Sequence, residues 1–106
     1  SSVLVVEGFL DMLKARQMGV KSVVAVLGWK MSQQQEQKLK HKGIKTIVCG
    51  LDNDDAGRKG YKYLQSLEGF NVVRLRYPKN VKDFGDVTPE IFEQRIKNQL
   101  DKYFLC

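Results

Sequence analysis

The stretch Thr46-Ile47-Val48-Cys49-Gly50-Leu51-Asp52-Asn53-Asp54-Asp55 decides the fold, because it joins an apolar run to a group of carboxylates. The run over residues 46–51 is short, rich in β-branched residues and bounded by turn signals, which predicts a buried strand. Side chains two residues apart on an extended chain point the same way, so Asp52 and Asp54 present two carboxylates where the strand opens into a loop.

The two carboxylates are suited to binding a metal ion. Neighbouring carboxylates repel each other unless a cation lies between them. Oxygen ligands suit Mg²⁺, which commonly takes one or two carboxylates and leaves its other positions to water and substrate phosphates. Asp52 and Asp54 therefore make metal-assisted phosphate chemistry the first functional hypothesis.

Another acidic residue occupies the same kind of position near the start of the chain. The apolar run at residues 3–6 ends in Glu7-Gly8, and apolar positions recur at helical spacing over residues 9–18. In open parallel α/β sheets, ligands bind outside the carboxyl ends of the strands. We therefore expect Glu7 to meet Asp52 in space, although the two are 45 residues apart.

Length and composition predict a single domain over residues 1–106. The chain is 42% hydrophobic and 28% charged, and no apolar stretch approaches the roughly 18 residues that a membrane helix needs. We expect no membrane contact and a cytoplasmic location. Cys49 and Cys106 form neither a disulfide framework nor a metal cluster, and His41 has no neighbouring zinc ligands. The net charge of +6 favours nucleic acid or nucleotide phosphates as partners.

Strand and helix patterns alternate along the whole chain. Ser32 with Gln35 predicts a capping box, and Thr88 followed by Pro89 predicts a helix start. Alternating elements of this length predict an α/β, Rossmann-like fold with a parallel sheet of about four strands flanked by helices. The expected strands are residues 3–6, 23–26, 46–51 and 71–77, and the expected helices are residues 9–18, 33–42, 55–67 and 89–104, with a loop over residues 78–87.

Several of these segments resemble the Toprim domain, the metal-binding catalytic module of bacterial DnaG-type primases, topoisomerases and small nucleases. Residues 5–11, Val-Val-Glu-Gly-Phe-Leu-Asp, resemble the first family motif and its primase form E-G-Y-x-D. Residues 51–58 resemble the second motif with the primase D-x-A-G-R, and residues 26–28 resemble the S-L-G loop. Lys82-Asp83 resembles the K-D that opens the third acidic segment, where Gly85 stands in place of the second aspartate and Asp86 follows it.

The resemblance implies a role for each acidic residue. Glu7 would act as general acid or base, Asp52 and Asp54 would bind Mg²⁺, with Mn²⁺ as a substitute, and Asp83 would hold a second ion or its waters. Other replication or RNA-processing proteins are implied as partners. The candidate contacts to phosphate or nucleic acid are Gly8, Lys30, Arg58 and Lys82.

Structural alternatives exist for these acids. Asp52 and Asp54 also fit a turn and a helix N-cap, and Asp83 and Asp86 fit an ordinary solvated loop. An EF-hand is excluded, because the bidentate glutamate that ends its loop has no counterpart at Tyr63.

The functional alternatives divide into enzymes and binding modules. The primase-like flanks favour nucleotidyl transfer in DNA replication, whereas the absence of a polymerase core in this chain favours a small Toprim nuclease that cleaves RNA or DNA. A receiver-like signalling domain also builds an acidic Mg²⁺ pocket at strand ends, but it pairs two acids after its first strand, and here Gly8 follows Glu7. The remaining alternative is a nucleic-acid-binding module without catalysis.

Overall fold

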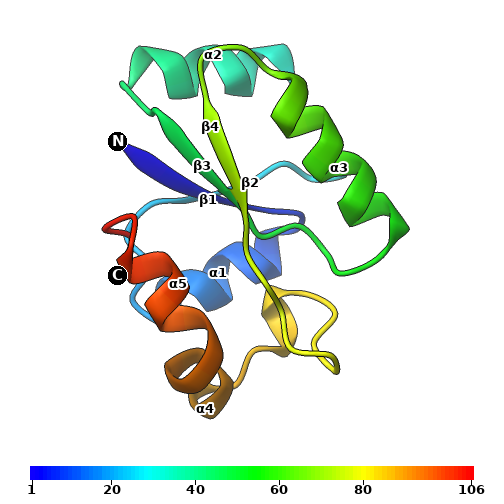
Figure 1. Ribbon diagram of the computed structural model, residues 1–106, viewed down its shortest axis with the longest axis vertical. Helices are drawn as coiled ribbons and strands as arrows, with labels where there is room; N and C mark the ends of the chain where they lie inside the picture. Colours follow the sequence, from blue (N-terminus) through cyan, green and yellow to red (C-terminus); the bar gives the residue numbers. More distant parts are fainter.

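The computed structural model describes all residues from 1 to 106, and its four strands form one parallel sheet in the order β2-β1-β3-β4 (Figure 1). The α/β class and the four-stranded parallel sheet expected from the sequence are confirmed. No helix of the chain has both the length and the apolar character needed to cross a membrane. The strands are β1 (Ser2–Val6), β2 (Val23–Ala25), β3 (Thr46–Cys49) and β4 (Asn71–Arg74), and the helices are α1 (Phe9–Gln17), α2 (Gln33–His41), α3 (Asp55–Ser66), α4 (Pro89–Ile91) and α5 (Lys97–Asp101).

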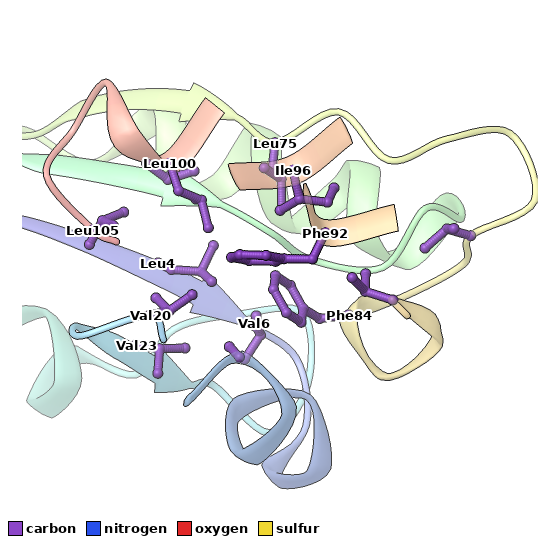
Figure 2. Packing of buried hydrophobic residues seen from close by; sticks show 14 residues of the cluster. Leu4, Val6, Val20, Val23, Leu75, Phe84, Phe92, Ile96, Leu100 and Leu105 are labelled. Carbon is purple, nitrogen blue, oxygen red and sulfur yellow. The ribbon is translucent and has the colours of Figure 1, made fainter. Parts of the chain in front are cut away.

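The two central strands are apolar on both faces because helices cover both faces of the sheet. In β1, Leu4 and Val6 belong to one buried cluster, formed with α1 and the C-terminal helices, and Val3 and Val5 belong to another, formed with α2 and α3. Figure 2 shows the first cluster, into which Phe84 projects beside Leu4 and Val6. Each fully buried Val or Leu contributes roughly 1.5–3 kcal/mol, so β1 is a main anchor of the fold.

The fourth strand is shorter than expected. The sequence pattern predicts a strand over residues 71–77, whereas β4 ends at Arg74. Its neighbour β3 ends at Cys49, whose carbonyl accepts the last ladder bond from Leu75 N–H at 2.9 Å. Beyond that point β4 has no strand to pair with.

The C-terminal helix begins as expected but is not continuous. Thr88 caps it by accepting a hydrogen bond from Ile91 N–H at 3.2 Å. A π-helical segment, Phe92–Ile96, then separates α4 from α5, and the helix ends at Asp101 rather than at residue 104. Phe92, Ile96 and Leu100, spaced four apart along these helical segments, are all buried.

The segment between β4 and α4 is not the solvated loop that its polar composition predicts. Val81, Phe84 and Val87 are each no more than 3% exposed and belong to the first cluster. A short 3-10 turn, Phe84–Asp86, directs the phenylalanine inward. This segment is therefore fixed against the core, with its polar residues on the outer side.

Candidate functional site

The topology brings Glu7 and Asp52 to one place. The chain runs from β1 to β2 on one side and returns to β3 on the other side of β1, so β1 and β3 are neighbours at the switch point of the sheet. Val5 pairs with Cys49 in the parallel register. Glu7 lies two residues beyond this pair and Asp52 lies three residues beyond it, so both follow the same edge of the sheet.

Each of these two side chains has one oxygen buried without a partner. Glu7 Oε1 and Asp52 Oδ1 are inaccessible to solvent and accept no hydrogen bond. Burial, together with the nearby Glu7 carboxylate, raises the pKa of Asp52 to about 7. Burial and the Asp54 carboxylate also raise the pKa of Glu7 above its usual range. Buried acceptors of this kind are costly unless something donates to them, so these two oxygens oppose folding as they stand.

The structure separates the roles of the D-x-D pair. Asp54 is the N-cap of α3, and its Oδ1 accepts a hydrogen bond from Gly57 N–H at 2.8 Å. Asp54 therefore serves as a helix cap, and its second oxygen makes no hydrogen bond within the chain. Asp52 makes no cap bond at all, which removes the turn-and-cap explanation for that residue.

Asp83 is also an N-cap, and the carboxylates of Asp11 and Asp86 lie close enough to affect its pKa. Its Oδ1 accepts a hydrogen bond from Asp86 N–H at 3.1 Å and starts the 3-10 turn. Burial, followed by the Asp11 carboxylate, raises the pKa of Asp83. Asp86 is exposed, and its Oδ2 accepts a long hydrogen bond of 3.4 Å from Lys82 N–H.

Asp11 is a site residue whose main role the sequence reasoning missed. Its position in the first turn of α1 predicts only a favourable interaction with the helix dipole. In the structure Asp11 Oδ2 accepts a hydrogen bond from Gly8 N–H at 3.0 Å, while Oδ1 accepts one from Gly85 N–H at 2.8 Å. The local contact has a sequence signal, an acid three residues after the helix start, whereas the contact to Gly85 spans 74 residues and has none.

Further hydrogen bonds hold the strand-end loops to one another. Asn53 N–H donates to the Lys82 carbonyl at 2.6 Å and joins the loop after β3 to the segment after β4. The Tyr77 hydroxyl, a second feature that the sequence reasoning missed, donates to the Gly50 carbonyl at 2.6 Å. The Tyr77 ring also packs edge-on against Phe84, with centroids 6.4 Å apart. The backbone that carries Asp52 is therefore supported from two directions.

The glycines near the strand ends are required for different physical reasons. Of Gly8, Gly28 and Gly57, which follow three strand ends, only Gly28 has a positive φ, at +149°. Gly8 has an ordinary extended φ of −112°. Gly57 is needed for close approach, because a Cβ there would lie 1.7 Å from the carbonyl oxygen of Asp52.

The three candidate cations are placed differently. Lys82 lies close enough for its charge to lower the pKa of Glu7, against the larger effects that raise it. Arg58 forms an ion pair with Asp55 on the first turns of α3. Lys30 is exposed, with its ammonium 5.1 Å from the centroid of the Tyr63 ring. Lys82 is therefore the candidate cation with an electrostatic link to Glu7.

The carboxylates do not form a closed metal cage. No group of three or more His, Cys, Asp or Glu side chains in the chain is arranged to enclose an ion by itself. The unpartnered oxygen of Asp52 and the second oxygen of Asp54, which makes no hydrogen bond within the chain, nevertheless fit a hard cation that keeps water or phosphate in its other positions. The donor set is oxygen only, which suits Mg²⁺ or Mn²⁺ better than zinc or copper.

Comparison with known proteins identifies the family. Residues 4–88 match the family model described as Toprim-like. The chain belongs to the Toprim-like family. The matched part of this Toprim-like domain contains every acidic residue described above, from Glu7 to Asp86.

Its relatives include DNA primases. The chain is 36% identical over 90 residues to the uncharacterized protein MG010 of Mycoplasma genitalium, which covers 82% of this chain and 41% of the relative. It is 32% identical over 111 residues to the DNA primase of Aquifex aeolicus, which covers 89% of this chain and 22% of the primase. The Toprim-like domain thus spans less than half of the length of either relative.

Solved structures agree with the fold. A crystal structure of the Aquifex aeolicus primase, with zinc-binding and RNA polymerase domains, matches with a TM-score of 0.67 at 30% identity and covers 95% of this chain and 24% of that one. A DNA primase domain from Pseudomonas aeruginosa matches with a TM-score of 0.68 at 28% identity and covers 98% of this chain and 36% of that one. The primase-like character expected from the sequence is therefore confirmed.

Proposed function

We propose that residues 1–106 act as a single Toprim domain in Mg²⁺-dependent phosphoryl or nucleotidyl transfer on nucleic acid. The observation that carries this proposal is the pair of buried, unpartnered oxygens on Glu7 and Asp52 at the ends of adjacent strands. The DNA primases among the relatives favour nucleic acid as the substrate class. Membership in the Toprim-like family favours this function over a receiver-like domain.

Three carboxylates are the proposed cation ligands. Asp52 offers a buried oxygen, and Asp54 keeps one oxygen free while the other caps α3. Asp83, on the segment after β4, would hold a second ion or the water around the first. Bound there, Mg²⁺ would neutralise and orient the phosphate that reacts.

Glu7 is the proposed proton-transfer group. A general acid or base works best when its pKa is near the working pH, and burial raises the pKa of Glu7 in that direction. Lys82 lies where its charge acts on Glu7, so it is the proposed phosphate contact nearest to the reaction. Gly8 adds a backbone N–H, which Asp11 occupies in this structure, so a phosphate contact there requires Asp11 to release it.

The first test is a Mg²⁺ titration of the metal-free protein, followed by calorimetry and by thermal unfolding. Saturating Mg²⁺ at ten times its Kd stabilises a protein by about 1.4 kcal/mol, and hence raises the Tm by roughly 5–10 °C for a domain of this size. Asp52→Asn/Asp54→Asn should lose this response. Asp101→Asn is the matched control, because Asp101 pairs with Lys97 on α5 and belongs to no strand end.

The second test separates transfer from hydrolysis. Labelled single-stranded RNA and DNA are incubated with Mg²⁺ or Mn²⁺, with and without nucleoside triphosphates. Extension supports nucleotidyl transfer, and shortening supports the nuclease alternative. A folded protein that binds Mg²⁺ but does neither, and whose Glu7→Gln variant behaves identically, would overturn the catalytic proposal.

A further inference from the structure

A group of aromatic and cationic side chains lies on α3 and on the loop after β2, outside the carboxylate site. Trp29 and Tyr63 meet edge to face, with ring centroids 6.2 Å apart. Lys59 Nζ lies 4.3 Å from the centroid of the Trp29 ring, and Lys30 Nζ lies 5.1 Å from that of Tyr63. We call these four residues the Trp29 cluster.

The backbone holds this cluster in place. The loop between β2 and α2 reaches α3 (Figure 1), and a Cβ on Gly60 would lie 2.5 Å from the carbonyl oxygen of Trp29. The same loop contains Leu27 at a positive φ of 58°, a conformation that a leucine adopts only when its surroundings require it. The loop is thus strained two residues before Trp29, and the Trp29 backbone lies directly against α3.

Packing against the core explains only part of this arrangement, because Tyr63 packs against the buried cluster under α2 and α3 whereas Trp29 is not among the residues that do. Val26 and Met31, on either side of the loop, are 8% and 1% exposed and belong to the cluster under α2 and α3. Trp29 and Tyr63 are only half-buried, and both lysines are exposed. The core is thus filled by the flanking residues, and the rings keep part of their surface in solvent.

The two lysines are free to bind anions. The three ion pairs of the chain are Lys40 with Glu36, Arg58 with Asp55, and Lys97 with Asp101, so neither Lys30 nor Lys59 is neutralised by a carboxylate. Exposed contacts between a lysine and a ring are weak, so a phosphate can draw the ammonium away from the ring.

We propose that the Trp29 cluster binds unpaired bases of a single-stranded nucleic acid, with the bases stacked on Trp29 and Tyr63 and the phosphates held by Lys30 and Lys59. Rings interleaved with cations suit a single strand, because every base offers a face for stacking and every linkage carries a charge. The inference rests on the proposed function for the class of ligand, and it adds the surface that holds the strand.

The position of the cluster fits a strand that leads to the carboxylates. α3 begins at Asp55, and at a rise of about 1.5 Å per residue Tyr63 lies roughly 12 Å along the helix from that start. Three or four stacked nucleotides, at about 3.4 Å each, span this distance. A hollow of about 310 Å³ on this part of α3 is lined by Asp55, Arg58, Lys59 and Lys62, and Lys62 adds a further cation that no carboxylate pairs with.

The chain contains one tryptophan, so its fluorescence reports on this surface directly. The full chain is titrated in EDTA with twelve-nucleotide oligo(dT) and oligo(U), and with a DNA duplex of the same length. We expect saturable quenching by the single strands and little by the duplex. Tighter binding of oligo(U) would assign the surface to RNA, and tighter binding of oligo(dT) would assign it to DNA.

Variants are compared by the anisotropy of labelled oligonucleotides. Trp29→Leu should weaken binding about tenfold, as expected for the loss of one stacked base, and Lys59→Ala should weaken it less and reduce the salt dependence. Phe70→Leu is the matched control, because Lys40 covers Phe70 at 5.6 Å in the same kind of contact elsewhere on the surface. Circular dichroism establishes that each variant is folded, and Lys59→Ala tests the proposal if Trp29→Leu is not.

Asp52→Asn separates this inference from the proposed function. It should bind oligonucleotide in EDTA like the wild type, even though it loses Mg²⁺ binding. Binding without a change in Trp29 fluorescence, or equal binding by wild type, Trp29→Leu and Lys59→Ala, would overturn the proposed role of the Trp29 cluster. Neither result would bear on the proposed metal site. No binding of any single strand by the folded wild type would also overturn it.

Discussion

Replacing Gly57 with alanine tests whether α3 is pressed against the backbone of Asp52. The new Cβ would lie 1.7 Å from the Asp52 carbonyl oxygen, whereas real Cβ atoms essentially never come within 3.0 Å of another heavy atom. The obstacle is backbone, so either α3 or the Asp52 loop must move by at least about 1.3 Å.

The size of the effect follows from two opposing terms. Overpacking costs typically 1–3 kcal/mol, and the upper part of that range applies because no flexible side chain can give way. Alanine in a helix interior stabilises the folded protein by about 0.5–1 kcal/mol relative to glycine. We therefore expect a loss of about 2 kcal/mol in the free energy of unfolding, which lowers the Tm by roughly 8–16 °C.

The assay is urea and thermal unfolding of Gly57→Ala in EDTA and in Mg²⁺. Because the carboxylate of Asp52 moves with its backbone, the stabilisation by Mg²⁺ should also shrink. Gln65→Ala, on the exposed side of the same helix, is the control and should stay within about 0.5 kcal/mol of the wild type. A Gly57→Ala protein as stable as the wild type, with an intact Mg²⁺ response, would refute the close approach of α3 to Asp52.

Three further predictions concern other parts of the molecule. Since the folded state raises the pKa of Asp52 to about 7, the folded form keeps a proton that the unfolded form releases near pH 4. The metal-free protein should therefore lose stability as the pH rises from about 4 to about 7, and Mg²⁺ should raise the Tm more at pH 8 than at pH 5; the opposite trend would contradict the raised pKa. Tyr77→Phe removes the donor to Gly50 and should cost about 1–3 kcal/mol in urea unfolding, because the carbonyl is left unpaired, with an unchanged midpoint as the contrary result. Burial raises the pKa of Cys49 to about 11, so its thiol should react with a disulfide reagent only as fast as the protein opens, whereas the half-buried Cys106 should react first.

The parts of the fold that the sequence predicts well are those set by local periodicity. β1 and β3 are apolar on both faces because helices cover both faces, and that pattern is visible in residues 3–6 and 46–49. The Ser32 cap is confirmed, since its side chain accepts a hydrogen bond from Gln35 N–H at 3.1 Å. Local chemistry decides these features, and no distant contact alters them.

The features of the fold that the sequence does not predict depend on contacts between residues far apart in the chain. The segment over residues 78–87 is rich in polar residues, yet tertiary packing buries Phe84 and fixes the acids around it. A three-residue spacing of Val81, Phe84 and Val87 was a signal for this burial, because residues three apart share one side of a helical turn. The length of β4 depended instead on where β3 ended, which the local pattern of β4 does not contain.

The same division holds within the site. The acids follow strand ends, and this is readable from the chain, but which oxygen is free and which is used as a cap is not. One carboxylate oxygen of Asp54 and one of Asp83 each accept a hydrogen bond from a backbone N–H, whereas neither oxygen of Asp52 does. This difference depends on how α3 and the 3-10 turn start, and therefore on three-dimensional placement.

The support around the carboxylates explains how a folded chain tolerates them. Buried acceptors without partners oppose folding, and they persist only where the surrounding structure determines their positions. Three hydrogen bonds do so here from outside the strands: Asp11 to Gly85, Asn53 to Lys82, and Tyr77 to Gly50. The first joins α1 to the segment after β4, and the other two join the loop after β3 to that segment, so the bonds hold together the segments that carry the carboxylates. Under the proposed function, the energy that opposes folding without a metal would become binding energy when Mg²⁺ binds, and the site should bind the ion best in the geometry that the loops already hold.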